Sequence, residues 1–157
     1  MKRPIGEWPY DHRPERVAFK IVEPLVLRLL FNRHYDWPIA ISDNSDCCQF
    51  DVSPGVTIAG GAIERMPPPF DHVGEAAFLV TPFVRGWVPD IYYAARDMIQ
   101  AARDKRDYRR VQCHVAADDP LQVAFAERLG FVHEGRLLRM GPDATDMHIM
   151  RWEPWQQ

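Results

Sequence analysis

Short apolar stretches along the chain predict a series of strands. Val17, Phe19 and Ile21 share one face of the first stretch, whereas 76–83 is mostly apolar and is typical of a buried strand. Pro82, near the end of that stretch, predicts an interruption of the strand ladder there. The predicted strands are 16–22, 39–41, 48–52, 56–65, 76–83, 109–115, 131–140 and 147–152.

Three other segments carry apolar residues at the spacing of one helix face. The predicted helices begin at Pro24 and end before residue 36, run from 90 to 103, and run from 120 to 129. In the first, Val26, Leu29 and Leu30 share one face with Arg33. Asp119 is placed to cap the third helix, and Gly130 is placed to end it in a left-handed turn.

The order of these elements predicts one mixed α/β domain over residues 16–157, preceded by an irregular, proline-containing arm at 1–15. One helix joins 76–83 to 109–115, so we expect these strands to be parallel neighbours with a right-handed crossover. The Gly60-Gly61 pair predicts a bulge or a close backbone contact. The Pro67–Pro69 segment is expected to be a loop inside the domain.

Composition excludes several classes of function. The 157 residues are 46% hydrophobic and 26% charged, with a formal net charge of −3, so no basic field exists for nucleic acid or an anionic membrane. No apolar run is long enough to span a bilayer, and no secretory signal is visible. Three cysteines without a pairing pattern favour the reducing cytoplasm, and the histidines lack metal-ligand spacing, so no metal site is expected.

The C-terminal part of the chain carries a recognisable motif. Residues 119–131 read Asp-Pro-Leu-Gln-Val-Ala-Phe-Ala-Glu-Arg-Leu-Gly-Phe, and residues 132–139 read Val-His-Glu-Gly-Arg-Leu-Leu-Arg. The first string resembles the penultimate helix of the GNAT (acetyl-CoA-dependent N-acetyltransferase) superfamily. The second resembles the Glu-Gly-x-Leu-Arg stretch of the branch that acetylates ribosomal-protein N-termini. The resemblance covers 76–153 well and 16–65 only by element order, and it implies a mixed central sheet with splayed parallel strands flanked by helices.

The resemblance also implies an acetyl-CoA site where the two central strands diverge. The family's loop, Arg/Gln-x-x-Gly-x-Gly/Ala, brings backbone N–H groups close to the pyrophosphate at a helix N-terminus. Here Arg85 takes the first position, but Val88 and Asp90 replace the glycines, and Gly86 lies one position away. A carboxylate about 4 Å from a phosphate would be repelled by about 4 kcal/mol at an effective dielectric of about 20, unless Asp90 turns away to cap its helix. The residues expected to contact the cofactor are Phe83, Val84, Arg85, Gly86, Trp87, Val88, Asp90 and Asp119.

The general base for the acceptor amine is expected at Glu75, with His72 as the rival candidate. The tyrosine that many family members use as general acid falls at Ala126, beside Phe125. Asp119 stands where the family often has Asn, or serves only as the helix cap.

Two functions remain open at this point. The first is an acyltransferase that moves an acetyl group from acetyl-CoA to an amine-bearing small molecule or a protein N-terminus. The alternative is a non-catalytic binding or structural protein that resembles phage-encoded GNAT-like proteins with a degraded cofactor loop. The alternative implies a protein partner rather than a substrate.

Overall fold

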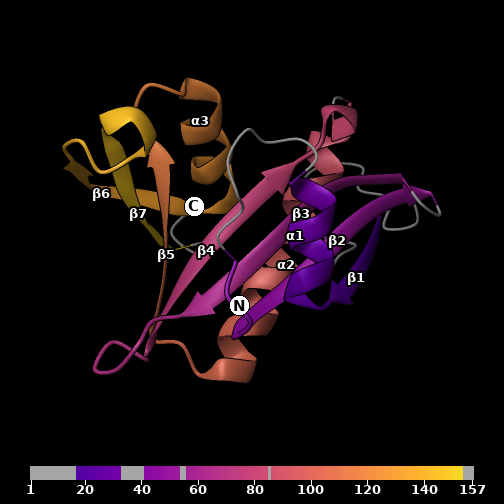
Figure 1. The fold of residues 1–157 in the computed structure, drawn as a ribbon, viewed down its shortest axis with the longest axis horizontal. Coiled ribbons are helices and arrows are strands. Elements are labelled where there is room, and N and C mark those ends of the chain that lie inside the picture. Colours follow the sequence, from indigo (N-terminus) through magenta and orange to yellow (C-terminus); the bar gives the residue numbers. More distant parts are fainter. Residues whose placement is uncertain (1–16, 33–40, 54–55, 85, 154–157) are drawn as a thin grey trace.

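The computed structural model of the protein describes residues 17–32, 41–53, 56–84 and 86–153. In this part of the chain seven strands form one sheet in the order β1-β2-β3-β4-β5-β7-β6 (Figure 1). The elements, including the short 3-10 helices η3 and η4, are β1 (Ala18–Val22), α1 (Pro24–Phe31), β2 (Ser45–Ser53), β3 (Val56–Arg65), β4 (Val73–Val80), η3 (Pro82–Val84), α2 (Val88–Arg106), β5 (Arg110–Ala116), α3 (Pro120–Leu129), β6 (Phe131–Leu137), η4 (Pro142–Ala144) and β7 (Met147–Trp152). The predicted N-terminal arm at 1–15 lies outside the described residues.

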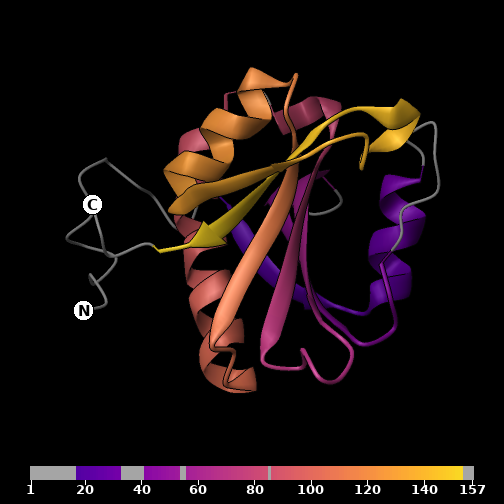
Figure 2. The ribbon, with the colours of Figure 1, turned by 90° about the vertical axis from the view of Figure 1, so that its left-hand side faces the viewer.

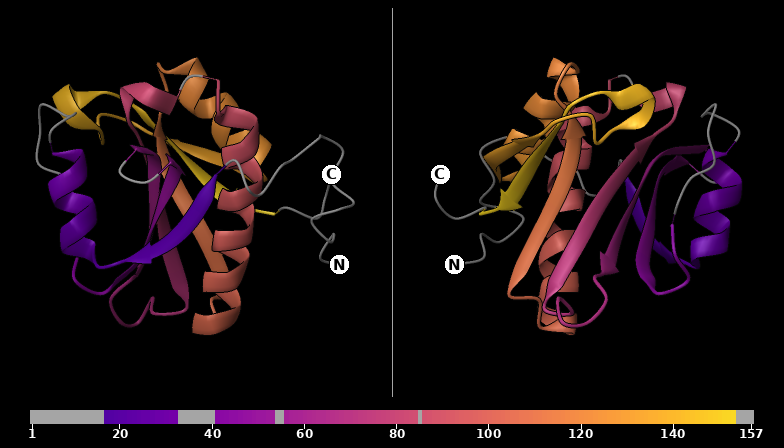
Figure 3. Two further views of the ribbon diagram at one scale, coloured as in Figure 1. Left: turned by 90° about the vertical axis from the view of Figure 1, so that its right-hand side faces the viewer. Right: turned by 60° about the vertical axis from the view of Figure 1, so that its left-hand side comes forward.

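The central strands β4 and β5 are parallel neighbours joined by α2, as the sequence predicts. Their pairing covers only Val73–Arg110, Gly74–Val111 and Glu75–Gln112. Beyond this paired end β4 continues along β3 and β5 continues along β7, so the two strands diverge toward an open end (Figure 3). The other strand pairs in the described sheet are antiparallel.

The sheet lies between helices on its two faces, with α1 on one side and α2 and α3 on the other (Figure 2). The larger apolar cluster lies under α2 and α3, and the smaller one lies under α1. Strand alternation divides neighbouring residues between the faces: Cys48 and Ile63 join the larger cluster, whereas Cys47 and Ala62 join the smaller one. No helix in the described residues is long and apolar enough to cross a bilayer.

The Gly60-Gly61 pair allows both helices to approach β3 closely. A Cβ on Gly60 would lie 2.6 Å from Leu27 Cδ1, and a Cβ on Gly61 would lie 3.0 Å from Met98 Cε. Leu27 belongs to α1 and Met98 to α2, so the two glycines serve opposite faces of one strand. The strand pairing is regular through both positions, so the predicted close contact is present and the bulge is not.

The paired end is held by packing around Gly74. A Cβ on Gly74 would lie 2.8 Å from Ile63 Cγ2 and 3.0 Å from the Tyr108 ring. The Arg65 guanidinium lies over the Tyr108 ring and donates to the carbonyl oxygens of Asp71 and Arg106. These contacts tie the β3–β4 connection to the end of α2.

The structure corrects several predicted boundaries. β4 is Val73–Val80 rather than 76–83, because Pro82, which has no N–H, begins η3 instead of continuing the ladder. α2 is longer than the predicted 90–103 and runs from Val88 to Arg106. Of the predicted strand at 39–41, only residue 41 is described, and it is not in a strand.

The predicted apolar face of α1 is not the buried one. Leu27 and Phe31, spaced by one turn, are buried with Pro24, whereas Val26 and Leu29 are exposed. Apolar residues lie on both sides of this helix. The side with Leu27 and Phe31 is the buried one because these two side chains pack closely against Gly60.

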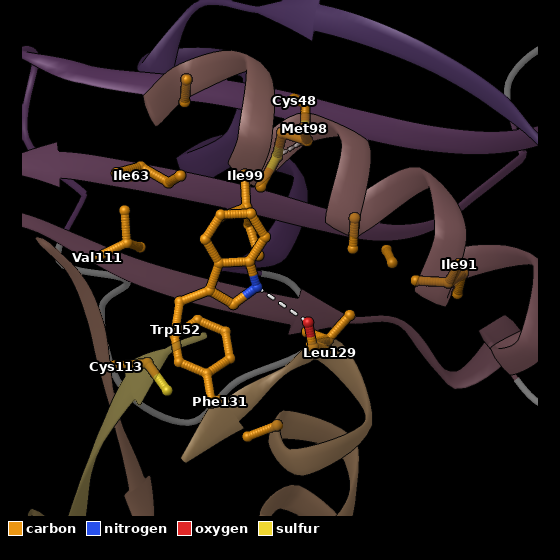
Figure 4. Packing of buried hydrophobic residues seen from close by; sticks show 14 of the residues in the cluster. Cys48, Ile63, Ile91, Met98, Ile99, Val111, Cys113, Leu129, Phe131 and Trp152 are labelled. Atoms are coloured by element: carbon orange, nitrogen blue, oxygen red, sulfur yellow. Dashed lines mark hydrogen bonds between the residues drawn. The ribbon is translucent and has the colours of Figure 1, made fainter. Parts of the chain in front are cut away.

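The end of α3 is as predicted. Gly130 has φ 104° and follows the helix in the left-handed region, and Leu129 and Phe131 are buried. The Trp152 indole Nε1 donates to the Leu129 carbonyl oxygen at 2.9 Å (Figure 4). The helix end, β6 and β7 therefore share one core.

We expect Gly60→Ala to lower the free energy of unfolding by about 1–3 kcal/mol, because the new methyl group overlaps Leu27 and Phe31 in a packed region. Denaturant unfolding measures the change. Gly135→Ala is the control, since its Cβ would lie an ordinary 3.5 Å from Ile149 Cγ2. Equal stability of the two variants would mean that α1 does not need the glycine.

Phe131→Ala is expected to cost about 3–5 kcal/mol of stability, since Phe131 is buried at the meeting point of α3, β6 and β7. The measurement is again the denaturation midpoint. Val132→Ala, at the neighbouring position and 40% exposed, should cost much less. An unchanged midpoint for Phe131→Ala contradicts this packing.

Candidate functional site

The site begins at the last paired residues of the diverging strands. Glu75 pairs with Gln112, and its side chain contacts two β5 side chains. Gln112 Nε2 donates to Glu75 Oε2 at 2.9 Å, and His114 Nδ1 lies within hydrogen-bond reach of Glu75 Oε1. His114 lies two residues after Gln112 on β5, so it is on the same face of the sheet as Gln112 and is the first residue of that face beyond the paired end.

Strand alternation explains why these groups meet. Along β5, Val111, Cys113 and Val115 are buried in the cluster under α2 and α3. Gln112 and His114 therefore lie on the opposite face, which is the face that carries α1. The side chains of Glu75 and His114 retain 25% and 28% of their exposure, so the pair is accessible from this side.

A polar network extends from the pair across the sheet. Arg110 Nε donates to Gln112 Oε1 at 2.7 Å, and the same guanidinium pairs with Glu134 of β6. Arg151 of β7 also donates to Glu134, with its Nη1 2.7 Å from Glu134 Oε1. The base candidate is thus part of an ordered network rather than an isolated carboxylate.

Two pKa values in this network depart from their ordinary range. The hydrogen bond to Glu75 raises the pKa of His114, against the opposing effect of burial. The hydrogen bond from Arg110 lowers the pKa of Glu134. His114 therefore holds its proton to a higher pH than an isolated histidine does.

The rival candidate, His72, lies elsewhere. It is an exposed residue immediately before β4, and its carbonyl oxygen accepts from Arg109 N and Arg110 N. These bonds are at the paired end, whereas Glu75 stands where the open end begins. The geometry groups Glu75 with β5 side chains and leaves His72 apart from them.

The predicted cofactor loop lies between η3 and the start of α2. Phe83 is 61% exposed, whereas Val84 and Trp87 pack against the larger core cluster. Gly86 has φ 88°, and nothing lies within 4 Å of the position its Cβ would take. Its backbone is therefore open to close approach. Arg85 lies outside the described residues.

The first turn of α2 contains Val88, Pro89 and Asp90. Asp90 is buried, so its carboxylate is not displayed on the surface of the loop. Pro89 has no N–H and so removes one of the donors that a helix N-terminus offers to an anion.

Four aromatic rings line the α2 and α3 side of the diverging strands. Phe78, three residues beyond Glu75 on β4, lies with its ring centroid 5.0 Å from that of Phe125 on α3. Phe125 lies 4.9 Å from Tyr92 on α2, and Phe78 lies 5.7 Å from Phe50 on β2. We call Phe78, Phe125 and Tyr92 the aromatic bridge, because they connect β4 to both helices.

Helix α3 places the other predicted residues. Asp119 Oδ1 accepts from Leu121 N and Gln122 N, both at 3.1 Å, so this side chain caps the helix. Ala126 is buried and Phe125 lies in the aromatic bridge, so α3 presents no hydroxyl group at either position. The role of Asp119 in cofactor binding stays a prediction.

The described residues give little support for a cysteine nucleophile or a metal site. Burial raises the pKa of the Cys113 thiol to about 12, so this cysteine is protonated and unreactive at neutral pH, as expected for a strand thiol. No group of His, Cys, Asp and Glu suited to a metal ion occurs in the described part of the chain.

Sequence reasoning missed Gln112 and His114. The alternation of β5 separates His114 from Cys113, and that much is visible in the sequence. Pairing these residues with Glu75 requires the register between β4 and β5, which no local pattern contains.

Comparison with known proteins identifies the fold. No protein-family model matches the sequence, and no curated protein matches it significantly. A GCN5-related N-acetyltransferase from Kribbella flavida has a TM-score of 0.69 at 20% identity, over 88% of this chain and 98% of that one. A ribosomal-protein-S5-alanine acetyltransferase from Vibrio fischeri has a TM-score of 0.70 at 12% identity, over 90% and 94%. A variant of the spermidine N-acetyltransferase from Vibrio cholerae has a TM-score of 0.70 at 15% identity, over 88% and 94%.

These likenesses show that the chain has the fold of the GCN5-related N-acetyltransferases, as the C-terminal motif predicts. The diverging pair β4 and β5, with α2 crossing between them, is the feature in which the predicted and observed architectures agree. At these identities the likeness concerns the fold, and activity has to be argued from the residues.

Proposed function

We propose that this protein is an acyltransferase that moves an acetyl group from acetyl-CoA to an amine. The observation that carries the proposal is the proton-accepting pair, Glu75 and His114, at the point where the central strands part. An amine that attacks a thioester has to give up a proton as the amide forms, so such a transferase needs a base within hydrogen-bond reach or one water away. The pair is partly exposed and meets that requirement.

Binding of the acetyl donor is supported by the loop before α2. Gly86 leaves its backbone accessible, and the N-terminus of α2 favours negative charge such as a pyrophosphate. The burial of Asp90 removes its carboxylate from the loop surface. We therefore propose Gly86, Val88 and the neighbouring loop residues as the phosphate-binding segment, with the exposed Phe83 and the Trp87 ring beside it.

When bound, acetyl-CoA supplies the acyl group and a thiolate leaving group. Glu75 and His114 take the amine proton as the new N–C bond forms. Since α3 has Ala126 and Phe125 where a hydroxyl donor would stand, we propose that the leaving thiolate takes its proton from water. The proteins with this fold include a spermidine N-acetyltransferase and a ribosomal-protein-S5-alanine acetyltransferase, so we propose a small amine or a protein N-terminus as acceptor.

The proposal is tested by incubation with acetyl-CoA and either spermidine or a peptide with N-terminal alanine, with the acetylated product detected by mass spectrometry. The double variant Glu75→Gln with His114→Gln should lose about 10²–10⁴ in kcat/KM, the usual contribution of a general base. His72→Gln is the matched control and should keep the wild-type value, because His72 lies at the paired end.

Donor binding has its own measurement. Acetyl-CoA at about 100 times its Kd should add about 2.7 kcal/mol to the stability of the wild type in a thermal-shift experiment. Acetyl-CoA binding without product for any acceptor would mean that the acceptor class is wrong. If the wild type neither binds acetyl-CoA nor forms an acetylated product, the proposed function is contradicted.

The aromatic bridge favours a second candidate, a non-catalytic GNAT-like binding protein. Phe78 and Phe125 are in contact beside the diverging strands, and a donor lying between β4 and β5 has to displace that contact. Val88 and Pro89 in the first turn of α2 favour the same candidate, because Val88 lacks the conformational freedom of glycine and Pro89 lacks an N–H that could bind a phosphate. Such a protein would bind a protein partner instead of an acyl donor.

Calorimetry with acetyl-CoA separates the two candidates. For the second candidate we expect no binding by the wild type, and binding gained either in Val88→Gly with Asp90→Gly or in Phe125→Ala. The first variant restores the glycines of the loop, whereas Phe125→Ala removes the centre of the bridge. Micromolar binding by the wild type rules the second candidate out.

A further inference from the structure

The hydrogen bonds around Glu75 run in one fixed direction. Arg110 is a donor only, so the Gln112 atom that faces it must be the amide oxygen, at 2.7 Å. The Gln112 NH₂ group then faces Glu75 Oε2 and donates to it at 2.9 Å. Glu75 is therefore an acceptor at this oxygen.

The same direction continues to His114. The second oxygen of Glu75 contacts His114 Nδ1. Imidazole is more basic than a carboxylate, so the proton between them belongs to the histidine, and Nδ1–H donates to Glu75. Both oxygens of Glu75 are thus engaged by β5 donors, and the lone pair of a neutral His114 lies on Nε2.

His114 Nε2 is better placed than Glu75 to meet a substrate. Glu75 stands at the last paired position, whereas His114 lies two residues farther along β5, within the open end. His114 contacts Glu75 through Nδ1, and no side chain or backbone group in the described part of the chain hydrogen-bonds its Nε2.

We propose that His114 Nε2 takes the proton of the acceptor amine and that Glu75 is a positioning residue that fixes the tautomer and orientation of His114. This inference rests on the proposed acyl transfer. In the step, the amine nitrogen forms a bond to the acyl carbon, the carbon–sulfur bond breaks, and its electron pair leaves on the CoA sulfur. The displaced amine proton moves to Nε2, and His114, then protonated on both nitrogens, returns it to water.

The charged groups around His114 define the expected pH dependence. Glu75 faces it from β4, Arg110 lies on β5 on the same face, and Arg151 of β7 and Glu134 of β6 complete the network, with the apolar Ile149 directly opposite on β7. Arg110 and Arg151 are both paired with Glu134, so Glu75 is the group whose charge His114 meets directly. The Glu75 bond raises the pKa of His114 above its ordinary value of 6.5.

The sign of the dependence follows from this. His114 accepts a proton only when it is neutral, so kcat/KM should rise with pH through the raised pKa of His114 and level off above it. Removing the Glu75 carboxylate removes the cause of the raised pKa. In Glu75→Gln the rise in kcat/KM should therefore move to lower pH.

The experiment measures kcat/KM against pH for the wild type, Glu75→Gln, His114→Gln and the control His72→Gln, with the NMR titration of the His114 ring in the first two. We expect His114→Gln to lose about 10²–10⁴ in kcat/KM and to lose the rise in kcat/KM with pH that the wild type shows. Glu75→Gln should keep a rise, shifted to lower pH, and His114 should titrate at lower pH in the NMR experiment as well. His72→Gln should follow the wild type.

Several outcomes would overturn the inference. If His114→Gln keeps most of the activity while Glu75→Gln loses it, Glu75 itself is the base and acyl transfer stands. If Glu75→Gln leaves the His114 titration unchanged, Glu75 does not position the ring, and this result is valid even if His114→Gln fails to fold. If the wild type transfers no acyl group to any acceptor, the proposed function fails and the base role fails with it.

Discussion

The short parallel contact between β4 and β5 determines the arrangement of the rest of the molecule. Three residue pairs join β1 to β4 on one side to β5, β7 and β6 on the other. At Gly74 the absence of a side chain lets Ile63 and Tyr108 pack closely over the paired end. Beyond Glu75 each strand follows its antiparallel neighbour, so the twist of the two halves separates them. The candidate base lies at this point of separation because the register ends there.

Much of the fold follows from local pattern. The cap at Asp119, the left-handed Gly130 and the buried Phe131 each depend on residues near in sequence, and their chemistry is specific enough to predict. The face of α1 was predicted wrongly, because its apolar residues surround much of the helix and the deciding contact is with Gly60, far along the chain. The strand at 76–83 was predicted to begin too late for a similar reason, because the pairing of Val73 and Gly74 with β5 depends on the register between distant strands.

The candidate site was predictable only in part. Glu75 stands out in the sequence as an acidic residue at the beginning of an apolar strand, but its partners are set by inter-strand register. A register shifted by one residue would turn Gln112 and His114 to the other face of the sheet and break the network with Arg110. The burial of Asp90 was equally hidden, because a carboxylate in the first turn of a helix is favourable whether it faces water or the interior.

The two faces of β4 argue for different functions. Glu75 and Phe78 are three residues apart, so the proton-accepting pair and the aromatic bridge lie on opposite faces of one strand. Moving the bridge by moving α3 would disturb a core fixed by Leu129, Gly130 and the Trp152 hydrogen bond. Rotation of the half-buried Phe125 ring leaves that core intact and costs much less, since it breaks contacts with only Phe78 and Tyr92 among the rings. The Phe125 side chain can therefore be changed without moving α3, so Phe125→Ala tests the aromatic bridge separately from the base and from the loop before α2.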